Sequence, residues 1–478
     1  MDFLRYIRLN IAWLAVCAGG SLALLLRGYN YFFFEFKEEQ AKILLNGLKL
    51  ARDGFFLTHG MESTVGFPNG PGMYQLSGVI ALTGGNSPEY FAAAALLFSM
   101  VAPLFLGVAA ARLLNVRIAL MAALLLAGTP MLIFLGANFW PQVFLPFWGT
   151  GIFYLAAEAW RRGDARFWCG ACALTAFTGS IHLSAFFLVP GLLLIFFLNR
   201  WRWPWFVLGG AAGVVILAPW LWYVIFEWEY QRFADPSAGW FKVWHWFRES
   251  INCFGGGFLA EYYGTDWIEG LREMFSAPVA VVLLLAGLLP WIGIVRTVVS
   301  WARKNPVPVP VRCAVILAGS PLVCYLLLGV HVYFFYLFLL MPFLCVVSAW
   351  GLDRISANIR RFIVIVWFFA SLLIAGGSLA DMDRGGGHPR EYGPSYDFWR
   401  SLRLDLRELE TQTGALNVHF QISERAGTRF SSGVVHFLLG DFMQQNGYPI
   451  LVRIDYDPEN RQFVRNFLPM RGMSPYKR

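Results

Sequence analysis

The stretch that decides the fold is residues 32–74, FFFEFKEEQAKILLNGLKLARDGFFLTHGMESTVGFPNGPGMY. It follows one apolar segment and precedes the next. It begins with the first acidic cluster of the chain (Glu35, Glu38 and Glu39), continues as a helix-like run and ends in a segment rich in Gly, Pro and Asn. We therefore predict a structured polar loop between two membrane spans, and we expect other loops on its side of the membrane to complete a site with it.

The composition predicts a polytopic membrane protein. Hydrophobic residues make up 57% of the 478 residues and charged residues 14%, whereas soluble domains average about 25% charged residues. A chain this long and this apolar cannot bury its surface in one water-soluble core. The net charge of +8 does not indicate nucleic acid, because most Lys and Arg lie in short loops between apolar segments, where the positive-inside rule accounts for them.

Eleven apolar segments are long enough to be placed as spans. They are about 11–30, 89–111, 118–135, 142–160, 167–180, 183–199, 205–226, 278–295, 313–330, 334–350 and 362–379. The first resembles the apolar region of a signal peptide but is longer, and we interpret it as an uncleaved helix. Every basic cluster between spans falls on one side, which the positive-inside rule makes cytosolic. Loops 31–88 and 227–277 and the tail then lie outside.

The first outer loop has local structure of its own. Residues 38–52 carry a rough apolar stripe and predict a helix that lies at the membrane interface. Asp53-Gly54 ends it, because Gly tolerates the left-handed conformation. Residues 67–72 predict a turn, and residues 73–82 predict a second interfacial helix that is too short to span.

The tail predicts a small α/β domain. Residues 385–389 read as a linker, 398–411 as an amphipathic helix, and 418–422 and 450–454 as strands. We interpret this domain as a cap or as an acceptor contact. The fold class is thus an all-α polytopic membrane protein of about 11 helices, residues 1–380, with an extracytoplasmic α/β domain at residues 381–478.

Five short motifs carry a resemblance to a known family. They are Lys37-Glu38-Glu39-Gln40, Asn69-Gly70-Pro71-Gly72-Met73-Tyr74, Asn138-Phe139-Trp140-Pro141, Ile181-His182-Leu183-Ser184 and His331-Val332-Tyr333. In order, spacing and topology the chain resembles the GT-C superfamily of integral membrane glycosyltransferases, in the bacterial branch near the protein mannosyltransferases and the lipid A aminoarabinose transferases. The resemblance covers roughly residues 1–380.

The resemblance implies an enzyme of the bacterial cytoplasmic membrane. It would move a sugar from a polyprenyl-phosphate-linked donor to a lipid, glycan or protein acceptor on the outer face, with inversion. One carboxylate suffices as general base for the acceptor hydroxyl, and the candidates are Glu38, then Glu39 and Glu35. The chain departs from the family at Lys37, where the leading residue of the pair is usually Asp. This departure leaves three alternatives: the base has moved to Glu38 or Glu39, the alignment shifts to Glu35, or the protein is a divergent or inactive member.

Further side chains are expected to bind substrate, because the departing phosphate needs cations or hydrogen-bond donors where its charge develops. The candidates are Lys37, Lys42, His59, Asn69, Tyr74, Asn138, His182, His331 and Tyr333. For several of them a structural role is an equal alternative. Asn138 would cap a helix, His182 would satisfy carbonyls at a span end, and His331 and Tyr333 would anchor at the interface.

No metal site is evident from the sequence, although a divalent cation is compatible with the reaction. No Gly-rich phosphate loop follows a strand, so a nucleotide-sugar donor is not expected. Cys169 and Cys172 have redox spacing, but they lie in an apolar span beside basic residues. Two other functions stay open: a transporter or flippase of lipid-linked glycans, which predicts ionisable residues inside spans, and a non-catalytic membrane scaffold.

Overall fold

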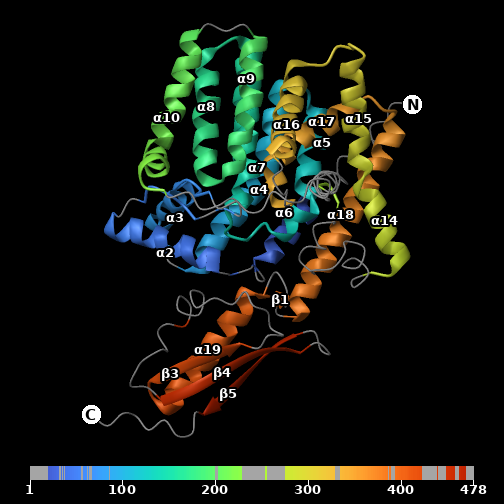
Figure 1. The fold of residues 1–478 in the computed structure, drawn as a ribbon. Helices are drawn as coiled ribbons and strands as arrows, with labels where there is room; N and C mark the ends of the chain where they lie inside the picture. The colour runs from blue at the N-terminus through green and yellow to red at the C-terminus, as the bar shows by residue number, and fades with distance from the viewer. Residues whose placement is uncertain are drawn as a thin grey trace.

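The computed structural model shows a body of helices joined to a small domain that contains a three-stranded sheet (Figure 1). The residues that it describes are 20–31, 34, 36, 38–54, 57–61, 63, 67–85, 87–199, 203–228, 253–255, 275–328, 334–385, 387–388, 393–422, 439, 448–457 and 462–469.

The helical body follows the apolar segments of the sequence. Helical backbone covers residues 20–30. The later helices are α2 (Glu38–Asp53), α3 (Gly72–Leu82), α4 (Pro88–Leu113), α5 (Val116–Gly128), α6 (Pro130–Phe134), α7 (Pro141–Arg162), α8 (Ala165–Ile181), η1 (Leu183–Leu188), α9 (Val189–Leu198), α10 (Trp203–Phe226), α14 (Ala277–Gly287), α15 (Leu289–Ala302), α16 (Val309–Leu328), η2 (Phe334–Leu339), α17 (Met341–Asp353) and α18 (Ala357–Gly385).

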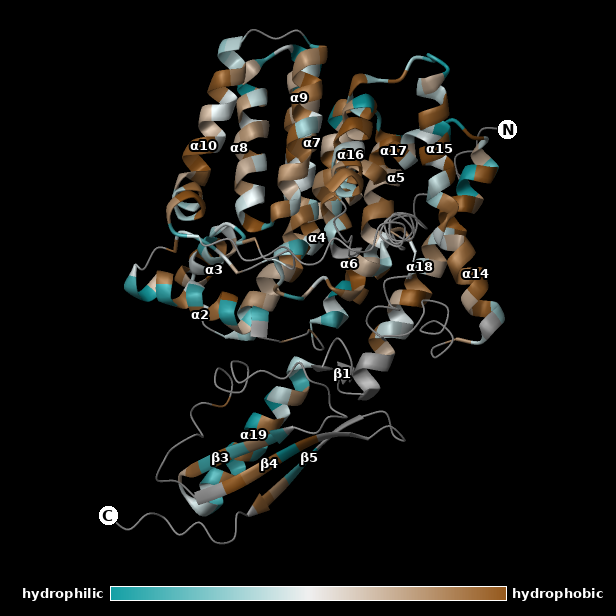
Figure 2. Cartoon of the chain, viewed as in Figure 1, coloured by the Kyte–Doolittle hydropathy of each residue, from teal (hydrophilic) through white to brown (hydrophobic). Residues whose placement is uncertain are grey.

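The chain is a mostly helical, multi-pass membrane protein. Among the described residues, five helical segments are long and apolar enough to cross a membrane: Pro88–Leu113, Trp203–Phe226, Pro278–Ala302, Val309–Leu328 and Ala357–Ala380. Figure 2 shows hydrophobic residues along these helices and hydrophilic residues on α2. All the predicted apolar segments from residue 89 onward are helical.

Four of the segments predicted as spans are interrupted along their length. Thr129 separates α5 from α6, and Leu288 separates α14 from α15. Two other segments begin as the 3-10 helices η1 and η2 before α9 and α17. In all four cases the second piece has Pro in its first turn. Proline lacks the N–H that a continuous helix needs and clashes with the preceding turn.

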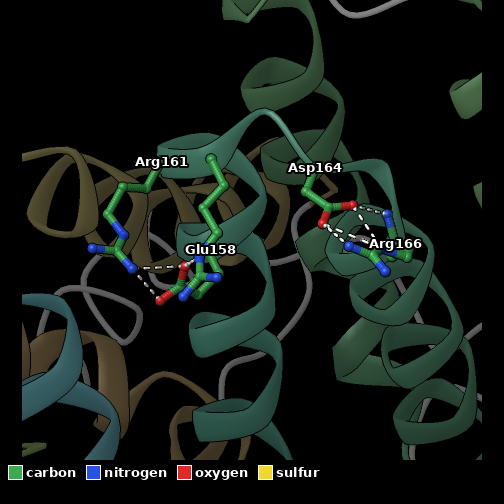
Figure 3. A network of polar contacts seen from close by, with 5 residues as sticks. Glu158, Arg161, Asp164 and Arg166 are labelled. Carbon is green, nitrogen blue, oxygen red and sulfur yellow. Dashed lines mark hydrogen bonds and ion pairs between the residues drawn. The ribbon is translucent and has the colours of Figure 1, made fainter.

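The turn between α7 and α8 shows how charge is placed at one end of the body. Glu158 is fully buried and accepts hydrogen bonds from Arg161, at 2.7 Å, and from Arg162 (Figure 3). Asp164 caps α8 by accepting from the Arg166 N–H at 2.9 Å, and it also pairs with the Arg166 guanidinium at 2.8 Å. The buried carboxylate is therefore compensated within its own turn.

Helices α2 and α3 pack against each other at one end of the helical body. Ser77 of α3 donates to the Ile43 carbonyl of α2 at 3.1 Å. A Cβ at Gly47 would lie 2.1 Å from Ser77 Oγ, so only glycine permits this approach. In Figure 1, α2 and α3 lie at the end of the body opposite the α9–α10 and α15–α16 turns. The two interfacial segments predicted from the sequence are thus both helical.

The tail is an α/β domain, as predicted, with one strand more than expected. Strand β3 (Leu416–Ile422) pairs in parallel with β4 (Tyr448–Asp457), and β4 pairs antiparallel with β5 (Gln462–Pro469). Helix α19 (Tyr396–Thr413) packs on the sheet, where Arg465 of β5 reaches Asp405 and Ser401 at 2.6 and 2.7 Å.

The connection to this domain differs from the predicted linker. Helix α18 continues through Gly385, and the two-residue strands β1 (Gly387–His388) and β2 (Gly393–Pro394) pair with each other. The run of glycines that suggested a flexible linker therefore begins inside a helix.

One buried charge in the body was not anticipated. Arg27 is 1% exposed and donates to the Ser99 carbonyl and hydroxyl and to the carbonyls of Leu126 and Ala127. The last two carbonyls belong to the C-terminal turn of α5, where the helix dipole favours a cation. Arg27 therefore fastens the first helix to α4 and α5.

Candidate active site

The acidic segment opens helix α2. Glu38 is its first residue, and Glu39 follows with an exposed side chain. Carboxylates are favoured at this end of a helix by its dipole. Gln40 is fully buried and so fixes which face of α2 meets the protein. Glu35, Lys37 and the Glu38 side chain lie outside the described residues.

Lys42 is exposed on α2, one turn beyond Glu38. Residues four apart share a face of a helix, so Lys42 and Glu38 belong to one face. The predicted base and a predicted phosphate-binding cation are thus placed next to each other along α2.

The turn of residues 67–72 is the second part of the site. The Asn69 carbonyl accepts from the Gly60 N–H at 2.7 Å, and the Asn69 N–H donates to the Met61 carbonyl at 2.9 Å. The Asn69 amide also donates to Met61 O at 3.0 Å, and its oxygen accepts from the Leu183 N–H at 3.4 Å. Asn69 thus joins the first outer loop to the start of η1.

Glycine is required at two positions of this turn. A Cβ at Gly70 would lie 2.6 Å from Ser180 Cα, and a Cβ at Gly72 would lie 2.2 Å from Ser180 Oγ. The turn therefore rests directly on the last residues of α8. This contact brings the Asn-Gly-Pro motif and His182, more than 100 positions apart in the chain, to one place.

His182 makes several polar contacts in this region. Its Nδ1 accepts from the Ser184 N–H at 3.3 Å and lies 2.7 Å from Ser184 Oγ. Its Nε2 lies 3.3 Å from Gln142 Nε2, while Gln142 Oε1 has no partner among the described residues. Turning the Gln142 carboxamide over would let its oxygen accept from Nε2–H, which matches a neutral ring with Nδ1 as acceptor.

The electrostatics agree with that tautomer. Burial lowers the pKa of His182 to about 4, so the ring is neutral at physiological pH and offers a hydrogen-bond donor rather than a charge. Tyr336 packs against it with ring centroids 5.6 Å apart, and Tyr325 stacks on Tyr336 at 5.9 Å. The residues His331 and Tyr333, predicted from the same segment as Tyr336, lie outside the described residues.

Aromatic side chains of α10 hold the other side of the loop. His59 stacks on Tyr223 with centroids 3.8 Å apart. Trp220 donates from Nε1 to the Pro68 carbonyl at 3.1 Å and stands edge to face with Phe67. The predicted His59 is therefore a partly buried packing partner of α10, and the outer end of α10 determines the path of the loop.

Two more predicted residues are buried nearby. Burial raises the pKa of Tyr74 to about 12, although a hydrogen bond with Asn46 acts in the opposite direction; Tyr74 stays neutral and links α3 to α2. Asn138 is fully buried just before α7, whose N-cap is Trp140. The alternative that Asn138 caps that helix is therefore wrong.

Some residues of the region were missed at the sequence level. Gln142, Ser184 and Tyr336 all contact His182, yet each lies in an apolar run that reads only as a helix. Ser184 belongs to the Ile181–Ser184 motif, which is the sequence signal that points to it. Among the described residues no group of three or more His, Cys, Asp or Glu could hold a metal ion.

The middle of the chain, including this end of the helical body, resembles a known family of membrane-embedded glycosyltransferases. Residues 71–223, from the Asn-Gly-Pro turn to the end of α10, match the family described as dolichyl-phosphate-mannose-protein mannosyltransferase. The match covers less than half of the chain, and it agrees with the sequence resemblance to glycosyltransferases that depend on a lipid-phosphate-linked sugar.

Two solved structures with TM-scores above 0.5 share the fold. ArnT from Cupriavidus metallidurans bound to undecaprenyl phosphate is 14% identical, with a TM-score of 0.54, and the similarity covers 90% of this chain and 85% of that one. The apo state of the same protein is 12% identical with a TM-score of 0.57 and the same coverage. The archaeal oligosaccharyltransferase AglB from Archaeoglobus fulgidus is 11% identical with a TM-score of 0.48, over 98% and 75% of the two chains. The comparison with curated proteins found no match.

Proposed function

We propose that the chain transfers a sugar from a polyprenyl phosphate to a lipid, glycan or protein acceptor on the outer face of a bacterial cytoplasmic membrane, with inversion. The observation that carries this proposal is the contact of the Asn69–Gly72 turn with Ser180 and Leu183, on either side of His182, at the end of the body that also holds the acidic start of α2. The eleven-span topology predicted from the sequence, with its basic clusters in the cytosol, supports an outer location for that end.

The chemistry needs few parts. The acceptor hydroxyl gives its proton to a carboxylate at the start of α2 as its oxygen attacks the anomeric carbon. The bond between that carbon and the phosphate oxygen breaks, and the phosphate leaves with the electron pair. Lys42 supplies positive charge, and hydrogen-bond donors near the turn face the developing charge. No covalent enzyme intermediate forms.

Neutral His182 is suited to orientation rather than to charge. Its Nδ1 is engaged by Ser184, which leaves Nε2–H as the donor. We infer that this donor, which faces Gln142, turns to a polar group of the substrate during the reaction. His331 and Tyr333 remain predicted contributors from the segment before η2.

The test of the base is a set of carboxamide variants. Glu38→Gln, Glu39→Gln, Glu35→Gln and the triple variant are assayed in membranes with a labelled polyprenyl-phosphate sugar, beside Glu408→Gln on exposed α19 as the matched control. We expect one single variant and the triple variant to lose at least about 100-fold in kcat, with the control unchanged. Normal transfer by all four variants would refute the assignment of the base to these residues. A wild-type chain that transfers no sugar would leave the scaffold alternative, which Lys37 keeps open.

Sidedness is tested separately. Gln40 is buried, so a reporter on it would be unreactive, whereas Lys49 of α2 and Lys304 between α15 and α16 are exposed. In a cysteine-free background, an impermeant thiol reagent outside the cell should label Lys49→Cys and not Lys304→Cys. The reverse pattern would overturn the orientation.

A further inference from the structure

The contact between the tail and the loop before α2 has no counterpart in the mechanism so far. Helix α19 begins at Tyr396, after the fully buried Ser395. The Tyr396 N–H donates to the Phe34 carbonyl at 3.0 Å. The first residue of α19 is therefore bonded to the backbone four positions before Glu38.

The Tyr396 ring strengthens that contact. It stacks on Phe34 with centroids 4.7 Å apart and planes 14° apart, and it meets Phe36 edge to face at 5.9 Å. Phe34 and Phe36 are 2% and 3% exposed, although neither lies in a helix or strand. Side-chain packing of this kind, together with the bond to the Phe34 carbonyl, helps to fix the position of Phe34 and Phe36.

The Tyr396 hydroxyl reaches a third element. It donates a hydrogen bond to Glu89 in the first turn of α4, and burial together with this bond raises the pKa of Tyr396. The phenol therefore remains protonated and keeps donating at physiological pH. Arg400 and Arg403, on the following turns of α19, also face this pair. One side chain thus ties the tail, the loop before α2 and the outer end of α4 together.

We propose that Tyr396 is a positioning residue, through which the C-terminal domain holds the acidic start of α2 in its working arrangement. The inference rests on the proposed function, because it assumes that a carboxylate of this segment is the base. The domain then acts on the first outer loop directly and is more than a cover over the site.

The test uses the full-length chain in nanodiscs with three variants. Tyr396→Ala removes the ring, Tyr396→Phe keeps the ring and loses the hydroxyl, and Leu404→Ala changes an exposed residue of the same helix. Hydrogen–deuterium exchange is followed in peptides covering residues 34–46 and, as an internal reference away from Glu89, residues 100–128. Steady-state kinetics of sugar transfer give kcat and the KM for the donor.

Tyr396→Ala should raise exchange in residues 34–46 by about tenfold or more, because local opening becomes easier, and leave residues 100–128 unchanged. Its kcat should fall by about tenfold or more, since small misplacement of a catalytic group is costly, while the KM for the donor stays within about twofold. Tyr396→Phe should lie between Tyr396→Ala and the wild type in both readouts. Leu404→Ala should match the wild type.

Unchanged exchange at residues 34–46, a rise that extends equally to residues 100–128, or normal kcat despite faster exchange would each overturn the inference. A wild-type chain that transfers no sugar would instead overturn the proposed function. The exchange experiment does not depend on activity, so the two failures are distinguishable.

Discussion

Replacing Gly70 by alanine is the sharpest test of how the site is assembled. The new Cβ would lie 2.6 Å from Ser180 Cα, 2.8 Å from Ser180 O and 2.9 Å from Ser180 Cβ. Two of these atoms are backbone, so no change of rotamer relieves the clash. Carbon atoms pack at about 3.5–4.0 Å, and the turn or the end of α8 must therefore move by about 1 Å.

The cost can be worked out from the same contacts. Overpacking of this kind costs about 1–3 kcal/mol, and displacement of Asn69 from the Leu183 N–H adds about 1 kcal/mol. A shift of about 1 Å at a catalytic site lowers rates by up to about 100-fold. We expect Gly70→Ala to lower the apparent unfolding temperature of the purified protein by a few degrees and to lower kcat by roughly 10- to 100-fold.

Gly376→Ala in α18 is the matched control, because a Cβ there meets nothing within 4 Å. It should retain wild-type kcat and unfolding temperature. Differential scanning fluorimetry and donor-transfer kinetics on the same preparations give both readouts. If Gly70→Ala behaves like Gly376→Ala, the turn does not rest on α8 as described, and the assembly of the site from these two motifs is wrong.

Two further perturbations probe the same region. The His182 pKa is about 4 in the folded chain against the usual 6.5, so the unfolded chain binds the extra proton first. The contribution of His182 to the free energy of unfolding should thus be complete above about pH 6.5 and fall by up to about 3 kcal/mol as pH drops towards 4. His182→Gln should flatten that part of the curve of unfolding temperature against pH. An unaltered curve would contradict a buried neutral ring. Trp220→Phe loses the hydrogen bond to the Pro68 carbonyl and should lower the free energy of unfolding by about 1 kcal/mol, with a measurable fall in kcat. Trp222 is 58% exposed, so Trp222→Phe should change neither quantity. Equal effects of the two substitutions would show that the bond does not hold the loop.

The positions of the helices could be predicted because membrane spans are encoded in the length of apolar runs, which is a local property. The interruptions at Thr129 and Leu288 could not, since proline is tolerated within many membrane helices, as Pro103 within α4 shows. Strand β5 was missed because Phe463 and Val464, then Phe467 and Leu468, come in adjacent pairs and hide the alternation of a strand.

The separate motifs of the candidate site could be predicted from the sequence, but the contacts between them could not. The Asn69 motif and His182 could each be found from local sequence, but nothing local indicates that the two meet at Ser180. Gln142 was hidden for a related reason, because a glutamine in the first turn of a helix usually faces solvent. Tyr396 could not be anticipated at all: its partners Phe34 and Glu89 lie more than 300 positions away.

The continuity of α18 has a mechanical consequence. A helix of 29 residues is about 43 Å long, whereas the hydrocarbon layer is about 30 Å thick. About two turns therefore project beyond the lipid as a continuous helix. We expect the domain that it carries to be held at a set distance from the lipid, so that the proposed acceptor would approach the site from the side.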